Sequence, residues 1–232
     1  MSAWDLFYKQ FVTYEGYKTV LQGLLVTVEV AVAGLVIGIV IGTLIAITRV
    51  VPKYKLLPRI LNRISDVYVG FFRGTPMVVQ LLLGYFVLLP ALHLHISNVT
   101  VSIIIFGLNS GAYVSEIMRG GIQSVDVGQL EAARALGMPF SVSMLKIVIP
   151  QAIKNILPTL GNEFIVLIKE TSVLSFIAVV DLTKAFRAIG DANYEYIIPY
   201  LMLAAVYLVL VVLITVGIRL LERRMKRSDR SR

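Results

Sequence analysis

The chain has 232 residues, of which 57% are hydrophobic, and its mean hydropathy is +0.82. A soluble globular domain of this length does not need so apolar a sequence, so the composition indicates a protein that crosses a membrane several times. The formal net charge of +8 would suit nucleic-acid binding, but the basic residues cluster beside hydrophobic segments, where they set membrane topology, and we expect no nucleic-acid partner.

Residues 1–18 are rich in aromatic side chains that alternate with polar ones. The aromatic residues recur at mostly helical spacing, and they are Trp4, Phe7, Tyr8, Phe11, Tyr14 and Tyr17. Aromatic rings favour the boundary between lipid and water. The pattern therefore predicts an amphipathic helix that lies in the membrane interface.

The first apolar segment, residues 19–48, is long enough to cross a hydrocarbon core of about 30 Å with some tilt. Gly34, Gly38 and Gly42 are four residues apart and share one helix face, a pattern that lets two membrane helices approach closely. Glu29 is ionisable at this depth and is therefore a functional candidate, although it is near enough to the start of the segment to reach the headgroups.

Residues 49–66 are polar and basic, with two prolines, and are predicted to form a loop before the second span at residues 67–89. The sequence Phe-Arg-Gly-Thr-Pro interrupts that span at residues 72–76. Because Pro76 lacks a backbone donor and disfavours helix at Thr75, we expect a short entry helix to end there and the span to restart near Met77.

The third span is predicted at residues 99–118, after a short loop that contains His93 and His95. These histidines have no third ligand nearby and the chain has no cysteine, so we expect no metal site. Polar groups at membrane depth need protein or water as partners, so this span should face the interior of a bundle. Asn109, whose amide suits a zwitterion, and Tyr113 are candidate substrate-binding residues.

The fourth span, residues 159–180, is the most polar. Glu163 and Glu170 are seven residues apart, so on a continuous helix both carboxylates project from nearly one face. Two such acids are costly in a bilayer unless they are hydrated, paired or occupied by a cationic ligand, which makes them candidate substrate-binding residues. The alternative is a structural ion pair of these acids with Lys169 or Arg119 inside the bundle.

The fifth span, residues 197–221, precedes a basic tail at 222–232, and the whole is an all-α integral membrane protein. Five spans place the termini on opposite sides. With the N-terminus outside, the inner side receives Arg49, Lys53, Lys55, Arg59, Arg63, Arg119, Arg134, Lys146, Lys154 and the basic residues from Arg219 onward. The outer side receives Lys9, Lys18, Lys184 and Arg187. The excess of basic residues predicts a cytoplasmic C-terminus.

Residues 119–158 form the loop between the third and fourth spans, and their centre reads QLEAARALGMPFSVSMLKIVIPQA at 129–152. Glu131, Ala132, Ala133 and Arg134 favour helix, whereas Gly137 and Pro139 break it before a second segment begins, so we expect two short helices with a hinge. The alanine face lets another surface approach closely. A helix of this kind in a cytoplasmic loop indicates docking, whereas an ordinary interfacial helix hairpin is the simpler alternative.

The order Glu-Ala-Ala, three residues, glycine, nine residues, then Ile-x-Ile-Pro resembles the EAA loop in the membrane subunits of ATP-binding cassette importers. Ile149 stands where that family usually has leucine, and Val127 stands where it commonly has proline. The Arg-Gly-Thr-Pro element resembles one in the polar amino-acid branch, which includes histidine, arginine and glutamine permeases of type I fold. The resemblance extends from Gly23 to about Leu221.

This resemblance implies a permease subunit in the bacterial cytoplasmic membrane that works by alternating access. It implies two ATPase subunits, a second copy or a paralogous permease, and an extracellular or periplasmic substrate-binding protein as partners. The coupling residues would be Glu131, Ala132, Ala133, Arg134, Leu136 and Gly137. The chain has no phosphate-binding loop of the Gly-x-x-x-x-Gly-Lys-[Ser/Thr] type, so we expect no catalysis here, with ATP and magnesium bound by the partner ATPase.

In the resembling subfamily, the Asn-Glu-Phe-Ile and Lys-Glu-Thr-Ser segments line the translocation path, and an acid at Glu163 favours a cationic amino acid: arginine, lysine or histidine. Two other transport mechanisms remain open: a secondary transporter, which needs no docking loop, and a homo-oligomeric channel, which would want a filter sequence or a ring of charge near its axis. A membrane-embedded enzyme is disfavoured, since the acids and histidines form no nucleophile–base arrangement.

Overall fold

The computed structural model describes residues 2–50 and 56–230, and every regular element in these two ranges is helical. In chain order the elements are α1 Ala3–Tyr8, η1 Lys9–Thr13, α2 Gly16–Val50, α3 Leu56–Gly74, α4 Met77–Leu83, η2 Gly84–Leu88, α5 Leu89–Ala91, α6 Asn98–Gln123, α7 Val127–Ala135, α8 Phe140–Ser143, η3 Met144–Val148, α9 Ile149–Glu170, η4 Thr171–Ile177, α10 Leu182–Asp191 and α11 Ile197–Arg230.

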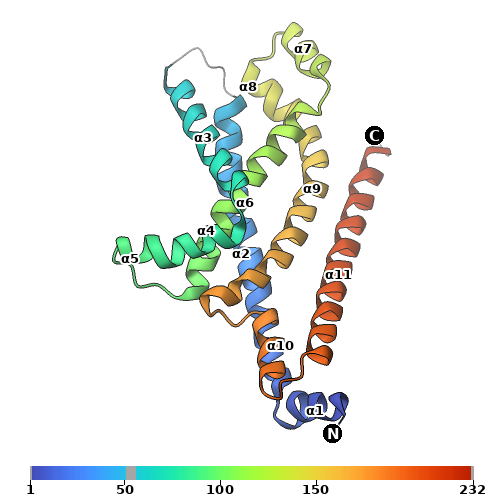
Figure 1. Ribbon diagram of the computed structural model, residues 1–232. Coiled ribbons are helices and arrows are strands. Elements are labelled where there is room, and N and C mark those ends of the chain that lie inside the picture. The colour runs from blue at the N-terminus through green and yellow to red at the C-terminus, as the bar shows by residue number, and fades with distance from the viewer. Residues whose placement is uncertain (1, 51–55, 231–232) are drawn as a thin grey trace.

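Four helical segments are long and apolar enough to cross a membrane on their own: Gly16–Arg49, Asn98–Gln123, Phe140–Ile177 and Ile197–Met225. A fifth crossing is possible if the bent pair of Leu56–Gly74 and Met77–Ala91 counts as one span. The predicted break after Gly74 and restart at Met77 are confirmed, with a bend of 108° between the two helices. In Figure 1 the chain turns sideways from α3 into α4 and α5.

The prediction of a loop over residues 49–66 is wrong for its second half, because α3 begins at Leu56. The apolar residues of this stretch recur at helical spacing and form one exposed stripe, Leu56, Ile60, Ile64, Val67 and Phe71. Arg59, Asn62, Arg63 and Asp66 gather on another side of the helix. The high density of polar residues led to the prediction of a loop, although the spacing of the apolar residues is that of a strongly amphipathic helix. Pro58 lies in its first turn, where a missing backbone donor costs nothing.

The glycine face of α2 packs against α6, as the sequence predicted. A Cβ atom added at Gly38 would lie 2.6 Å from the Cβ atom of Ser110, and one at Gly42 would lie 2.6 Å from Cγ1 of Val114. In return, a Cβ at Gly107 of α6 would meet Ile37 Cγ2 at 2.5 Å. The two backbones are therefore close enough that only glycine fits at the contact, which makes this pair the rigid centre of the bundle.

Replacing Gly38 with valine should destabilise the protein by about 1–3 kcal/mol or more, because extra methyl groups overpack a contact that has no free space. Gly217→Val is the matched control, since a Cβ atom at Gly217 of α11 meets nothing within 4 Å. The measurement is the thermal unfolding midpoint of each variant in detergent. Equal midpoints for the two variants would show that the α2–α6 contact is looser than the structure has it.

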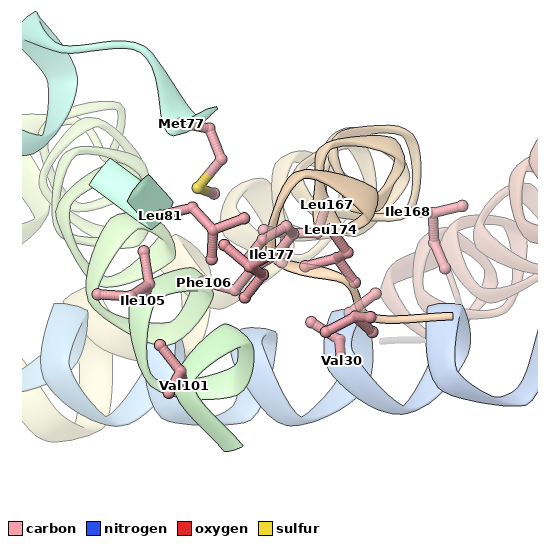
Figure 2. Close-up of a cluster of buried hydrophobic side chains, with 12 residues drawn as sticks. Val30, Met77, Leu81, Val101, Ile105, Phe106, Leu167, Ile168, Leu174 and Ile177 are labelled. Atoms are coloured by element: carbon pink, nitrogen blue, oxygen red, sulfur yellow. The ribbon is translucent and has the colours of Figure 1, made fainter. Parts of the chain in front are cut away.

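The main hydrophobic core lies where α2, α4, α6, α9 and η4 meet (Figure 2). Val30 of α2, Leu81 of α4 and Phe106 of α6 are fully buried there. Leu174 and Ile177 of η4 fold back into the same cluster, so the end of the fourth span packs inside the bundle. This core fixes α6 and α9 side by side and thereby sets the geometry of the polar residues on both helices.

Figure 1 shows that the long helices run between two ends of an elongated bundle. One end carries α7, α8, the start of α3 and the C-terminal end of α11, and the other carries α1 and α10. The basic residues assigned to the inner side by sequence fall at the α7 end wherever the structure describes them. The two groups of basic residues are thus separated along the long axis of the bundle.

Candidate functional site

The break between α3 and α4 is held by one buried side chain, Gln80. Its Nε2 donates to the carbonyl of Phe72 at 2.8 Å, to the carbonyl of Thr75 at 2.9 Å and to Thr75 Oγ1 at 2.8 Å. Non-helical backbone at membrane depth is tolerated only where polar groups inside the protein satisfy it. Gln80 therefore allows the chain to leave helix geometry in the middle of the bundle.

Asn109 of α6 joins the same network. Its Nδ2 donates to Gln80 Oε1 at 2.9 Å and approaches the Phe72 carbonyl at 3.4 Å. The structure thus uses the Asn109 amide donor to attach α6 to the break. Gln80 was not among the residues selected from the sequence. The available signal was a lone amide in the apolar run that follows Pro76.

Gln80→Leu should lower the stability of the protein by about 1–3 kcal/mol for each part-buried carbonyl that loses its donor, because leucine keeps the volume but donates to neither the Phe72 nor the Thr75 carbonyl. Gln22→Leu is the control, since Gln22 is exposed on α2. Unfolding in detergent, followed by thermal shift, compares the two. An unchanged midpoint in Gln80→Leu would mean that the break does not depend on this amide.

Glu163 lies on the side of α9 that faces α6 and is 7% exposed. Its carboxyl sits next to the hydroxyl of Ser110, which is buried and does not complete a well-aligned hydrogen bond. Glu170 is half-buried at the last residue of α9, about 10 Å further along the helix axis at 1.5 Å per residue. The two acids therefore share a helix side but occupy different depths and surroundings.

Arg119, one of the two basic residues that could have neutralised these acids, pairs with Glu116 instead. Its Nε and Nη2 donate to Glu116 Oε2 at 3.1 and 2.7 Å. The other, Lys169, is exposed. Within the ranges that the structure describes, Glu163 forms no ion pair.

The exposed face of α9 carries a polar stripe. Asn155, Thr159, Asn162 and Lys169 lie on one side of the helix and all four are exposed, with the exposed Val166 in the same row before Lys169. A polar stripe on a membrane-crossing helix is unstable against lipid. This face must therefore border water or another subunit.

Three guanidinium groups and two carboxylates meet where α2, α3 and α6 converge. Arg49 of α2 donates through Nη1 to Glu116 and through Nη2 to Asp66 at 2.8 Å. Arg73, at the end of α3, lies 3.8 Å from Glu116 and 5.6 Å from the centre of the Tyr113 ring. The network ties together helices that are far apart in the sequence.

An open pocket of about 460 Å³ lies beside this network, between α3, α6 and α9. Its lining includes Arg73, Tyr113, Glu116, Arg119, Asn155 and Thr159. We call it the arginine pocket. It connects the cluster of guanidinium groups with the polar stripe of α9, and it contains Tyr113, which was selected from the sequence, but not Asn109, Glu163 or Glu170.

The loop between α6 and α9 has the predicted helix, break and second helix. Asp126 caps α7 by accepting a hydrogen bond from the Gly128 amide at 2.8 Å. The helix ends at Ala135, and Gly137 has φ of +82°, a conformation that glycine adopts without strain. Pro139 then precedes the short helix α8.

Only one of the six coupling candidates is buried. Ala133 is 3% exposed and packs inward, and the nearby Leu130 joins a small core formed with Val125, Met144 and Val148. Glu131, Ala132, Arg134 and Gly137 are exposed, and Leu136 is 84% exposed. Arg134 Nη1 donates to the Met138 carbonyl at 2.8 Å and so braces the break. The loop is thus anchored to the bundle by Leu130 and Ala133, while its outer face, which includes Leu136, is exposed to solvent.

In the part of the chain that the structure describes, no group of three or more histidine, cysteine, aspartate or glutamate residues is placed to hold a metal ion. His93 and His95 are exposed in the loop after α5.

The structure combines a bundle of membrane-crossing helices, a broken span and a polar pocket between the helices. It also has a loop helix that is anchored to the bundle and exposes one face to solvent. This is the architecture of a membrane transport subunit. Residues 34–227 match the family described as the inner membrane component of binding-protein-dependent transport systems. The chain belongs to this family.

Relatives match along nearly the whole length. The putative glutamine transport system permease protein GlnP of Rickettsia prowazekii is 39% identical over 206 residues, which is 89% of this chain and 92% of the relative. The arginine transport system permease protein ArtQ of Bacillus subtilis is 37% identical over 210 residues, which is 90% of this chain and 94% of the relative.

Solved structures agree on the fold. A chain from the crystal structure of an amino acid ABC transporter with histidines is 39% identical, covers 94% of this chain and 98% of its own, and superposes with a TM-score of 0.85. A chain of the MetNI methionine ABC transporter has 17% identity and a TM-score of 0.71, with 91% and 96% covered, and shows the shared fold alone.

This chain is therefore a permease subunit of an amino-acid ATP-binding cassette importer. It is a transport subunit and not an enzyme, and ATP is hydrolysed by a separate subunit. Partner ATPase and substrate-binding proteins follow from membership of the family.

Proposed function

We propose that this subunit carries a polar amino acid, preferentially a cationic one, across the bacterial cytoplasmic membrane by alternating access. The observation that carries the proposal is the family match over residues 34–227 in a chain with a polar pocket between its helices. The named relatives transport glutamine and arginine at nearly equal identity to this chain. The cationic preference therefore rests on Glu163, an acid without an ion-pair partner among the described residues.

The orientation follows from the separated basic residues. The α7 end carries most of them and is the cytoplasmic end, so the N-terminus lies outside. The exposed face of α7, including Glu131, Ala132, Arg134 and Leu136, then points at the cytoplasm, where it docks on an ATPase subunit that binds ATP and magnesium. A substrate-binding protein delivers the amino acid at the opposite end.

The working assembly contains two permease chains, either two copies or this chain and a paralogue, and two ATPase subunits. Two surfaces that the single chain leaves uncovered support the proposal that a second permease chain packs against it. None of the most apolar part of α11 is buried within the chain, and α9 exposes its polar stripe. Lipid can cover α11 but not the stripe, so α9 faces a water-filled path that a second permease closes.

The test is uptake into proteoliposomes that contain the permease, its ATPase and the binding protein. We expect accumulation of arginine, lysine or histidine that requires internal ATP. Uptake that persists without ATP or without the ATPase would favour a secondary transporter or a channel. ATP-driven uptake of glutamine alone would retain the importer and reject the cationic preference.

A further inference from the structure

A second cavity, an apolar groove of about 400 Å³, lies at the α7 end of the bundle, where α2, α6 and the start of the fourth span meet. Its inner wall is formed by buried residues: Ala46, Met144, Ala152 and Ile156. Its rim is formed by residues that are between 45% and 64% exposed: Ile47, Leu145 and Ile153. The groove is therefore open at the surface of the bundle, and its volume is in the range of ligand-binding sites.

The groove lies on a different side of α9 from the polar stripe. At about 100° per residue, Ile149, Ile153 and Ile156 project about a third of a turn away from Asn155 and Thr159. The groove therefore does not share the water-filled border that the stripe requires. Its lining residues belong to three segments that are apolar enough to cross a membrane, so its open side faces the depth of the acyl chains.

A positive charge stands at the rim of the groove. Lys146 directly follows Leu145, is exposed, and forms no ion pair among the described residues. From Phe140 to Gly161, the stretch that supplies the α8 and α9 sides of the groove, the sequence has two lysines and no acid. None of the residues that line the groove is charged. An apolar groove with a cation at its edge matches an acyl chain and a phosphate held in one molecule.

We propose that this groove binds an acyl chain of an anionic phospholipid from the cytoplasmic leaflet, and that Lys146 holds the lipid phosphate. The cytoplasmic leaflet is the one whose lipids carry negative charge, and basic sites beside membrane helices on that side bind lipid headgroups. The hydroxyl of Ser141 lines the same groove and is exposed. The site is separate from amino-acid transport; only the choice of leaflet rests on the orientation proposed above.

The groove also gives the bound lipid a structural role. Phe140 of α8 and Leu145 of η3 line it from the loop, whereas Met118 of α6 and Thr43 of α2 line it from the bundle. An acyl chain between them makes apolar contacts with both parts. The lipid thus adds to the contacts that hold the loop helices against the bundle.

The experiment maps lipid contacts in proteoliposomes that contain the permease–ATPase complex. The probes are phosphatidylglycerol and phosphatidylcholine with the same photoreactive diazirine acyl chain, each added in trace amounts to identical bilayers, and mass spectrometry locates the adducts after illumination. The reference surface is the middle of α11, where Leu208, Val209 and Leu213 are exposed. The ratio of phosphatidylglycerol to phosphatidylcholine adducts should be at least about fivefold higher in the groove than on α11, the factor expected for one lysine.

Two substitutions test the two parts of the site. Lys146→Gln should lower the groove ratio to the α11 value, whereas Arg59→Gln, at an exposed position of α3 outside the groove, should not. Thr43→Phe fills the groove from an exposed position and should reduce its labelling by both lipids at least about fivefold, because the chain loses its apolar contacts. Leu44→Phe, at the next residue and outside the groove, is the matched control.

Three results would overturn the proposal. Equal ratios in the groove and on α11 mean that only unselected bilayer lipid is present. Absence of groove labelling by either lipid means that a protein surface, such as the ATPase, covers it. An unchanged ratio in Lys146→Gln removes the headgroup site, and this variant decides alone if Thr43→Phe does not assemble. None of these results bears on ATP-driven uptake, which tests the proposed function separately.

Discussion

Leu136→Asp should reduce ATP-driven uptake at least tenfold without loss of the folded permease. Leu136 is 84% exposed, so the substitution removes no packing within the chain. If the outer face of α7 docks on the ATPase, this leucine becomes buried at the interface, and a charge there is desolvated without a partner. The few hot-spot residues of an interface each cost about 2 kcal/mol or more when truncated, which corresponds to roughly thirtyfold in affinity.

The matched control is Leu136→Met, which keeps an apolar side chain of similar volume and should transport normally. Copurification of the ATPase and its hydrolysis rate are measured beside uptake, because docking can fail outright or persist without coupling. Either result fits a docking role for α7. Normal uptake by Leu136→Asp would show that this face of the loop does not transmit ATPase closure.

Features encoded within a few neighbouring residues could be predicted from the sequence. Pro76 alone locates the break between α3 and α4, because its missing donor and its effect on Thr75 are local. The spacing of the three glycines of α2 likewise predicts a close contact with another helix, although it does not identify that helix as α6. Gly137 ends the loop helix by adopting φ of +82°, which is again a property of one residue.

Pairings between distant residues could not be predicted in this way. Arg49 and Glu116 are 67 positions apart, and Gln80 and Asn109 are 29 apart. No local pattern states that these side chains meet, because the meeting depends on how α2, α3 and α6 pack. For the same reason Arg119 was considered as a partner of Glu163. In the structure Arg119 forms its ion pair with Glu116, which lies three residues earlier in the chain.

The amphipathic helix α3 shows a further limit. Its polar residues suggested a loop, and its apolar stripe was recognisable only as a helical repeat of leucine, isoleucine and valine. Hydropathy averaged over a window hides such a repeat, whereas the spacing of individual residues reveals it. The exposed stripe of α9 was missed for the complementary reason, since attention to Glu163 and Glu170 passed over Asn155, Thr159 and Asn162, the neutral polar side chains that precede them.

Glu163→Gln should weaken uptake of arginine, lysine or histidine roughly tenfold or more. A carboxylate that contacts a cationic side chain contributes a charge-assisted hydrogen bond of about 1.5–3 kcal/mol, and each 1.4 kcal/mol is about one factor of ten. Glu163 is 7% exposed where α9 packs against α6, and weak solvent screening there strengthens the attraction of its carboxylate for a cation. Uptake of a neutral amino acid should fall much less.

The substitution is a clean probe because glutamine keeps the shape of the side chain and can still lie against the hydroxyl of Ser110. No lysine or arginine is paired with Glu163 among the described residues, so removing the charge strands no buried cation. Glu15→Gln, which removes one negative charge at an exposed position near the N-terminus, controls for net charge. Complex yield and basal ATPase activity are measured with uptake. If Glu163→Gln assembles normally and transports cationic amino acids at the wild-type rate, Glu163 is not part of the substrate site, and its burial against α6 serves packing alone.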